Sequence, residues 1–417
     1  MKNVWVFFFS VIFLTSCANE RLSNSQSNEI LGETYDESEN NGVLHNLHGS
    51  KLWSKVYSES RGGDIRSLTG DIRSLTLTPD DGALLGGNTW SSGAGKTDMY
   101  LVRVNGDGNK LWEKTYGGSS WDYLNSLVLT SDGGALLGGK TSSSGAGGSD
   151  MYLVRVDEDG TKRWEKTYGG PYSDSIYSLA LTPDGGALLG GLTYSSGTDI
   201  SDMYLVRVDK AGNKLWEKTY GGSENDSIYS LAVTPDGGAL LGGLTYSSGA
   251  GGSDMFLVRV DEEGNKLWEK TYGGPNLDVI NSLVLTPDGG ALLGGHSSAS
   301  ELLIDFDMSL VRVDEAGNKL WEKTYGGSNL DVTNDLVLMP DGGALLGGKT
   351  NLNDDGKPDM SLVRVDGDGN KLWEKTYGES QNNWISSLVL THDGGALLGG
   401  AIRRDTGQFD MYLVRIE

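Results

Sequence analysis

The stretch SLVLTSDGGALLGGKTSSSGAGGSDMYLVRVDEDGTKRWEKTYGG, residues 126–170, contains four short apolar runs separated by glycine-rich turns. The runs are Ser126–Thr130, Ala135–Gly139, Met151–Val156 and Lys162–Tyr168. The D-G-G and D-x-x-G segments between them are typical of tight hairpin turns, because glycine readily takes the positive φ that such turns require. No part of the stretch shows the helical spacing of apolar residues. We therefore predict four consecutive antiparallel β-strands.

This pattern recurs along the chain from residue 49 onward. Its marker tryptophans are separated by 59, 52, 52, 52, 53 and 52 residues. The long first spacing comes from a duplicated heptad, since Asp64–Gly70 reads DIRSLTG and Asp71–Thr76 repeats DIRSLT. A period near 50 with four strand-sized runs predicts the blades of an all-β propeller. Seven tryptophans predict seven four-stranded antiparallel blades: Trp53, Trp112, Trp164, Trp216, Trp268, Trp321 and Trp373.

The two ends of the repeat region predict how the ring closes. The region begins with the last strand of the pattern, at residues 51–57, and the chain ends just where that strand would come next. We expect strand 51–57 to complete the last blade together with strands near residues 385–416. Such a splice removes two exposed strand edges that would otherwise favour aggregation.

The N-terminal residues resemble the signal peptide of a bacterial lipoprotein. Lys2 precedes an apolar run too short to span a bilayer, and Leu-Thr-Ser before Cys17 resembles a lipobox. The alternative is an ordinary secretory signal with a chance cysteine. We favour the lipobox because Cys17 is the only cysteine in the chain. The domain prediction is a signal peptide at 1–16, the lipidated Cys17 with a flexible tether to residue 48, and a propeller at 49–417.

The lipobox resemblance implies attachment to the membrane through acyl chains on Cys17, and more than one chain makes that attachment stable. We expect the protein in the bacterial cell envelope, at the outer membrane, with periplasmic and surface-facing display both open. The formal net charge is −23, so the folded body repels nucleic acid and anionic lipid headgroups. We predict no nucleic-acid partner, no cofactor and a monomer.

The G-N-K-L-W and G-G-A-L-L-G-G motifs resemble repeats of exported bacterial propellers and of quinoprotein-type propellers. The resemblance covers residues 49–417 and implies that Trp112 and its equivalents pack between blades. Quinoprotein dehydrogenases have eight blades and often a vicinal disulfide, whereas this chain has seven repeats and no cysteine after Cys17. Cofactor binding is therefore not carried over. The propeller lipoprotein of outer-membrane barrel assembly is similar in architecture, but a shared fold does not determine function.

Residues that could carry chemistry are sparse. His45 and His48 fall in the tether, and we place His296 and His392 at turns; none is spaced with a nucleophile or a carboxylate as a catalytic pair. The D-G-D-G-N turns, such as Asp366–Asn370, resemble the start of a calcium loop but have no glutamate at the twelfth position. We interpret them as hairpin turns and predict no metal site.

Each repeat also has an aspartate before its third strand and an arginine five residues later. We expect the aspartate, Asp98 in the first repeat, to order its loop through backbone hydrogen bonds. We expect the arginine, Arg103 there, to pair with the glutamate of W-E-K, Glu113, because a buried charge needs a partner. A ring of metal sites on these aspartates is the alternative.

Departures from the repeat gather in two loops, one after T-Y-G-G and one after A-L-L-G-G, which strand order places on the same face. Aromatic side chains beside Asp and Asn suit sugar stacking and also protein contacts. The candidate binding residues are Trp90, Trp121, Asp122, Tyr123, Tyr172, Asp174, Tyr194, Asp226, Tyr246, Asp278, Asp331, Asn383 and Trp384.

These loops lead to a functional hypothesis: a non-enzymatic, envelope-anchored propeller that binds a protein or glycan or acts as a scaffold. Two alternatives remain. One is a hydrolase or cofactor-dependent enzyme with its site at the central channel, and the other is a purely structural surface protein.

Overall fold

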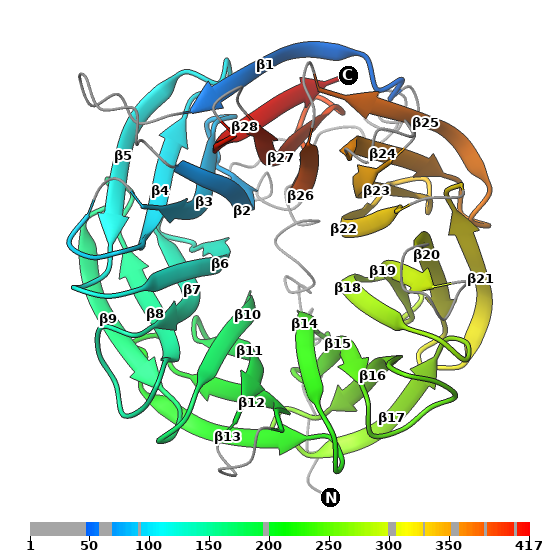
Figure 1. Ribbon diagram of the computed structural model, residues 1–417, viewed down its shortest axis with the longest axis horizontal. Coiled ribbons are helices and arrows are strands. Elements are labelled where there is room, and N and C mark those ends of the chain that lie inside the picture. The colour runs from blue at the N-terminus through cyan, green and yellow to red at the C-terminus, as the bar shows by residue number, and fades with distance from the viewer. Residues whose placement is uncertain are drawn as a thin grey trace, which may run out of the picture.

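The computed structural model describes residues 47–57, 69–90, 93–194, 200–298, 306–327, 330–351, 358–378, 382–403 and 407–417. These residues form seven four-stranded antiparallel sheets arranged in a ring, as Figure 1 shows. The prediction of an all-β, seven-bladed propeller is confirmed. No helix long and apolar enough to cross a membrane occurs within the described ranges. The predicted signal peptide, Cys17 and all but the last two residues of the tether lie outside these ranges.

Each blade runs from an inner strand at the axis to an outer strand at the rim. Blades 1 and 2 comprise β2 (Thr69–Leu77), β3 (Ala83–Thr89), β4 (Asp98–Val104), β5 (Lys110–Tyr116), β6 (Asp122–Leu129), β7 (Ala135–Thr141), β8 (Asp150–Val156) and β9 (Lys162–Tyr168). Blades 3 and 4 comprise β10 (Asp174–Leu181), β11 (Ala187–Thr193), β12 (Asp202–Val208), β13 (Lys214–Tyr220), β14 (Asp226–Val233), β15 (Ala239–Thr245), β16 (Asp254–Val260) and β17 (Lys266–Tyr272).

The remaining blades follow the same order. Blades 5 and 6 comprise β18 (Asp278–Leu285), β19 (Ala291–Ser298), β20 (Phe306–Val313), β21 (Lys319–Tyr325), β22 (Val332–Leu338), β23 (Ala344–Thr350), β24 (Asp359–Val365) and β25 (Lys371–Tyr377). Blade 7 comprises β26 (Asn383–Leu390), β27 (Ala396–Arg403), β28 (Phe409–Ile416) and β1 (Lys51–Tyr57). The predicted closure is confirmed, because β1 pairs antiparallel with β28 from Lys51 opposite Ile416 to Tyr57 opposite Met411.

The hydrophobic core is divided into seven clusters, each lying between two neighbouring blades. One cluster joins Met99 and Leu101 of blade 1 to Leu124, Leu127 and others of blade 2. Another joins blade 7 to blade 1, so the last interface is built like the first. A single sheet cannot bury both of its faces alone, and ring closure gives every blade two neighbours.

The glycines of A-L-L-G-G let neighbouring strands approach closely. A Cβ on Gly138 would meet the Leu179 side chain of the next blade at 2.8 Å. A Cβ on Gly139 would collide with the carbonyl oxygen of Tyr123 on the adjacent inner strand. The first glycine therefore leaves room for a side chain of the next blade, and the second leaves room for the backbone of the inner strand of its own blade.

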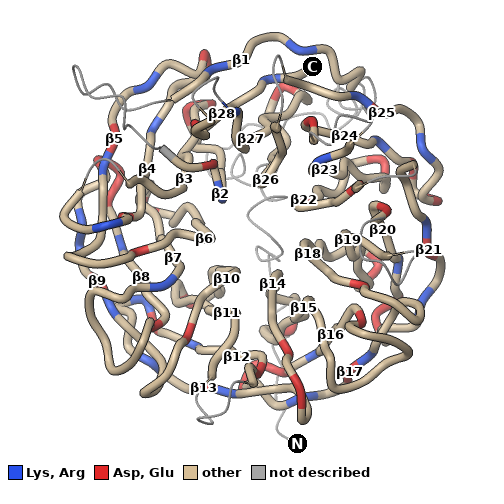
Figure 2. The backbone as a smooth tube through the Cα atoms, in the orientation of Figure 1, with Lys and Arg blue, Asp and Glu red and all other residues tan. Residues whose placement is uncertain are grey.

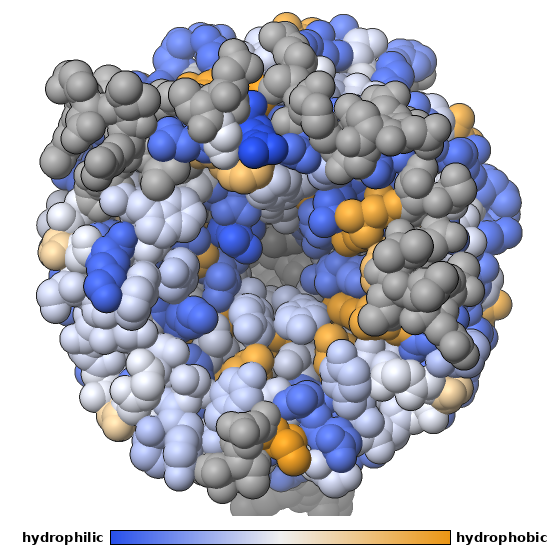
Figure 3. Space-filling view, in the orientation of Figure 1, coloured by the Kyte–Doolittle hydropathy of each residue, from blue (hydrophilic) through white to orange (hydrophobic). Residues whose placement is uncertain are grey.

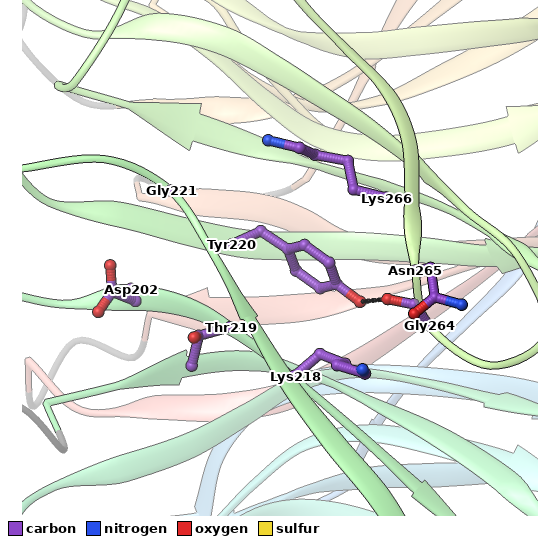
Figure 4. Close-up of a pocket in the computed structure, with 8 residues that line it drawn as sticks. All are labelled: Asp202, Lys218, Thr219, Tyr220, Gly221, Gly264, Asn265 and Lys266. Atoms are coloured by element: carbon purple, nitrogen blue, oxygen red, sulfur yellow. Dashed lines mark hydrogen bonds between the residues drawn. The ribbon is translucent and has the colours of Figure 1, made fainter.

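A contact between an outer strand and the segment just before the next outer strand repeats at all seven blade interfaces. The Tyr220 hydroxyl donates to the carbonyl oxygen of Gly264 in the next blade (2.7 Å), as Figure 4 shows. The Trp216 ring lies over the same glycine, whose φ is +75°. Burial raises the pKa of Tyr220, so its hydroxyl remains a donor. The expected packing of the marker tryptophans between blades is confirmed by the equivalent contacts of Trp53, Trp112, Trp164, Trp268, Trp321 and Trp373.

The first described residues, 47–49, form the same kind of contact with the outer strand of blade 6. The carbonyl oxygen of Gly49 accepts from Tyr377 (2.7 Å), and that of Leu47 accepts from the Trp373 indole (3.1 Å). Gly49 therefore takes the place that a hairpin-turn glycine takes in the other blades. The chain enters on the face that carries the β4–β5 turn and its equivalents, which we call the turn face.

The arginine of the third strand does not pair with the glutamate of W-E-K, so that prediction was wrong. Arg207 donates to Asp184 in the T-P-D-G-G turn (2.7 Å) and to the carbonyl oxygen of Val208 (2.6 Å). The glutamate Glu217 instead pairs with Lys214 (2.7 Å) and accepts from Tyr204. Arg207 lies opposite Trp216 and Glu217 lies opposite Val206, so the arginine and the glutamate project from opposite faces of the blade.

We expect Gly212→Ala to lower the free energy of unfolding more than Gly342→Ala does. Both glycines have positive φ, which costs an alanine about 1 kcal/mol. A Cβ on Gly212 would also lie 2.8 Å from the Trp164 ring, whereas one on Gly342 has no heavy atom within 4 Å. The collision adds about 1–3 kcal/mol. Urea unfolding of both variants measures the difference, and equal losses would contradict the role given to the tryptophan contact.

We expect the turn aspartates to support stability down to unusually low pH. The hydrogen bond from Thr286 and the contact with Arg312 hold the pKa of Asp288 at about 2. A pKa lowered by folding contributes stability above the unfolded value near 4, and this contribution disappears as the pH falls through about 2. The stability difference between the wild-type protein and Asp288→Asn should therefore shrink between pH 4 and pH 2. Asp107→Asn, at an exposed turn carboxylate without an ion pair to a described residue, is the control.

Candidate functional site

The two variable loops open on the same face of the ring, as predicted from strand order. Parallel bridges join the loops at Thr97 and Trp121, and again at Ser149 and Ser173. The Asp122 amide donates to the carbonyl oxygen of Thr97 (2.8 Å), which ties the loop of one blade to that of the next. We call this side, opposite the turn face, the variable face.

The predicted acidic residues lie beneath this face rather than on it. Asp122 accepts from the Gly118 amide (2.7 Å), the Ser143 hydroxyl (2.7 Å) and the Thr141 hydroxyl. Its side chain therefore connects the two loops from below. The same position is buried in the other described blades: Asp174, Asp226, Asp278, Asp331 and Asn383.

The aspartates before the third strands order their loops, as predicted. Asp150 accepts from the backbone amides of Ala146 (3.1 Å) and Gly147 (3.3 Å). The turn at Asp366 is held in the same way, because its carboxylate accepts from the Asp368 and Asn370 amides. Within the described ranges no group of three or more His, Cys, Asp or Glu side chains is placed to hold a metal ion.

Four of the predicted aromatic residues are exposed on the variable face. Trp90, Tyr172 and Tyr246 are each 46% exposed, and Trp121 is 42% exposed with the Lys96 ammonium 3.7 Å from its ring centre. The remaining predicted aromatics are partly buried: Tyr123, Tyr194 and Trp384. Trp384 packs on Phe409, with ring centres 4.8 Å apart.

A second variable set, not found from the sequence, surrounds the central opening. Six of the inner strands carry a register shift around a single residue, and β2 carries one at the equivalent place. This residue is Arg73, Asn125, Tyr177, Tyr229, Asn281, Asn334 or Ser386. The residue after A-L-L-G-G varies with it: Asn88, Lys140, Leu192, Leu244, His296, Lys349 and Ala401. Both positions vary between the aligned repeats, and this variation is the signal in the sequence that marks them.

In blades 3 and 4 these positions form an aromatic cluster. The Tyr177 and Tyr229 rings meet edge to face, with centres 5.5 Å apart. Burial, and then the neighbouring Tyr177, raise the pKa of Tyr229 to about 12, and Tyr246 and Tyr194 add to the shift. Two loop tyrosines predicted from the sequence thus belong with two tyrosines at the channel. We call these four residues the tyrosine cluster.

In blades 2, 5 and 6 the same positions are polar. The side-chain amides of Asn125, Asn281 and Asn334 each donate to a backbone carbonyl oxygen of the next inner strand, at 2.7, 2.8 and 2.7 Å. These bonds tie neighbouring inner strands together at the edge of the opening. Figure 3 shows a hollow at the centre of the ring with hydrophilic residues around it.

His296 lies in this polar part and not at a turn, so that expectation was wrong. It belongs to β19, its ring nitrogen Nδ1 lies 3.2 Å from the Asn281 amide, and its ring packs edge to face on Phe306. Burial and then Lys349 lower the pKa of His296 to about 4. His392 is at a turn as predicted and pairs with Asp81 (2.8 Å).

A buried serine lies below most of the channel residues and accepts a hydrogen bond from a backbone amide of the next inner strand. Ser126, for example, accepts from the Leu179 amide (3.2 Å). Blade 6 has Asp335 instead, which accepts from the hydroxyls of Ser282 (2.8 Å) and Ser387 (3.2 Å) and from two backbone amides. This carboxylate is 4% exposed, and its donors compensate for the loss of water.

A groove of about 370 Å³ lies on the outer wall between blades 3 and 4, as Figure 4 shows. It is lined by Asp202, Lys218, Thr219, Tyr220, Gly221, Gly264, Asn265 and Lys266. Most of these residues belong to the invariant parts of the repeat. The groove is therefore a consequence of blade packing and offers little specificity.

The described residues define the class: this is a seven-bladed β-propeller built from near-identical repeats, with variation on one face and at the channel. Regulatory protein FlaEY of Caulobacter vibrioides is similar to this chain, with 25% identity over 394 residues. These residues cover 85% of this chain and 38% of that protein, so the chain spans well under half of its relative. No protein-family model matches the chain.

Two solved structures are similar to this chain. Sqt1 from Chaetomium thermophilum has a TM-score of 0.47 and 14% identity, covering 89% of this chain and 100% of that one. A protein of unknown function from Dyadobacter fermentans has a TM-score of 0.47 and 12% identity, covering 88% of this chain and 99% of that one. Likenesses of this strength say nothing about function.

Proposed function

We propose that this protein is an envelope-anchored, non-enzymatic propeller that binds a protein or glycan through its variable face. The observation that carries the proposal is where the repeat varies. The blade interfaces and turns are nearly invariant, because each has a packing role. Variation is concentrated in the loops and around the channel, where side chains are available to a ligand. A distant relative named as a regulatory protein fits a non-enzymatic role.

The tyrosine cluster is the part of this face best suited to contact a ligand. Tyrosine offers a large rigid surface and a polar hydroxyl, which suits both sugar stacking and protein contacts. Tyr177 and Tyr229 pack against each other, so a ligand meets a surface that is already ordered. Pre-ordering reduces the entropy lost on binding.

Attachment through acyl chains on Cys17 at the outer membrane is the second part of the proposal. The described chain enters the ring on the turn face, where Gly49 contacts Trp373. An anchor preceding this point leaves the variable face on the opposite side of the ring. Periplasmic and surface-facing display are both compatible with this arrangement.

We expect replacement of Tyr194 and Tyr246 by alanine to weaken binding about tenfold or more, because buried aromatic contacts dominate most interfaces. Leu215→Ala with Leu267→Ala, at exposed leucines on the outer wall of the same two blades, is the matched control. The ring should be screened on a glycan array and against envelope proteins, and the affinity of any ligand compared across the variants. A ring that retains neither a glycan nor a protein would contradict the proposal.

We expect Cys17→Ser to abolish incorporation of labelled palmitate and to move the protein from the membrane fraction to the soluble fraction. Acyl chains on the sulfur and amino group of Cys17 would supply the membrane affinity, at about 0.8 kcal/mol per buried methylene. Ser16→Ala keeps the cysteine and should retain the label. A serine variant that stays labelled and membrane-bound would rule out this anchor.

A further inference from the structure

Lys349 is a half-buried lysine at the edge of the central opening. It lies on β23 directly after the two glycines, opposite Val332 of the inner strand and Met360 of the third strand. The equivalent residue of blade 1, Asn88, reaches the backbone of Leu124 in the next blade. This position therefore directs its side chain toward the next inner strand, beside the channel.

Lys349 has no hydrogen bond or ion pair with any described residue. Several other cations among the described residues do have partners. The third-strand arginines pair with turn aspartates, and the first lysine of most outer strands pairs with a glutamate. The net charge of −23 means that carboxylates are abundant, yet none is placed beside this lysine as an ion-pair partner among the described residues.

Removing a cation from water without a partner is unfavourable. Burial lowers the pKa of Lys349, which agrees with this picture. Lys349 also lowers the pKa of His296 in blade 5 further, so the two side chains lie in the same part of the channel. Lys349 and the His296 ring thus share one region of the opening, and no described carboxylate forms an ion pair with either.

Of two other cations beside the opening, one also lacks an ion-pair partner among the described residues and one is paired. Lys140, at the equivalent position of blade 2, lies 5.4 Å from the Tyr123 ring centre and has no ion pair with a described residue. Arg73 on β2 pairs with Asp71 (2.8 Å). Figure 2 shows positive charge on β2 and β23 beside the opening. Blades 3 and 4 instead have Leu192 and Leu244 at the position of the lysines, next to the tyrosine cluster.

We propose that the channel mouth binds an acidic saccharide, with its carboxylate on Lys349 and a sugar ring on the channel tyrosines Tyr177 and Tyr229. This inference rests on the proposed function and specifies its ligand. Charge-assisted hydrogen bonds from lysine to carboxylate are strong where water is excluded. Aromatic faces beside hydroxyl and amide groups suit the stacking of a sugar ring.

The test is calorimetric titration of the intact protein with trigalacturonate, the neutral galactotriose and triglutamate. We expect trigalacturonate to bind at least tenfold more tightly than galactotriose. Lys349→Met should remove this preference, and Lys349→Arg should restore most of it. Lys166→Met, at an exposed lysine on the outer wall, is the matched control and should change nothing. Thermal unfolding confirms that each variant is folded.

A second measurement is independent of heat signals. Reductive methylation followed by mass spectrometry reports the reactivity of each lysine, and trigalacturonate should protect Lys349 but not Lys166. Galactotriose binding as tightly as trigalacturonate would overturn the acidic preference and leave the proposed function standing. Tighter binding of triglutamate would overturn the saccharide class. If no probe binds or protects Lys349, the inference fails, whereas the proposed function is judged by the wider glycan and protein screen.

Discussion

Every blade is joined to the next by one recurring contact between an outer strand and a turn. The hydroxyl of a buried tyrosine donates to the carbonyl oxygen of a turn glycine, and a tryptophan ring covers the same glycine. The contact needs a tyrosine and a tryptophan in one blade and a glycine with positive φ in the next. It is also formed by Gly49 with Trp373 and Tyr377, so the first described residues and the C-terminal blades join by the same chemistry.

This dependence on neighbours explains why the repeat is nearly uniform. The core consists of seven inter-blade clusters, and each is complete only when two blades present matching side chains. A substitution at an interface changes the fit with an adjacent blade, which limits variation there. Positions at the variable face and the channel are released from this limit. Arg73, Asn125 and Tyr177 occupy the same place in successive blades although they differ in size and charge.

The charged residues also fall into two groups, those that stabilise the fold and those at the channel. The turn aspartates and third-strand arginines compensate each other on the turn face, and the buried aspartates beneath the loops are held by backbone amides and hydroxyls. Lys349 and Lys140 are not compensated in this way by described residues. An otherwise acidic protein thus has two lysines at its channel that lack an ion-pair partner among the described residues.

The blade count, the four strands of each blade and the closure by residues 51–57 followed from the sequence alone, because a period near 52 and turn glycines at constant offsets permit few other arrangements. The sequence also indicated which loops share a face. Tertiary structure alone decided that Asp122 and its equivalents are buried and that Arg207 pairs with Asp184. It also placed His296 in a strand and brought Tyr177 and Tyr229 together at the channel. The reason is physical: periodicity specifies which residues lie on a strand, whereas burial and partners depend on the next blade, which is about fifty residues away in the sequence.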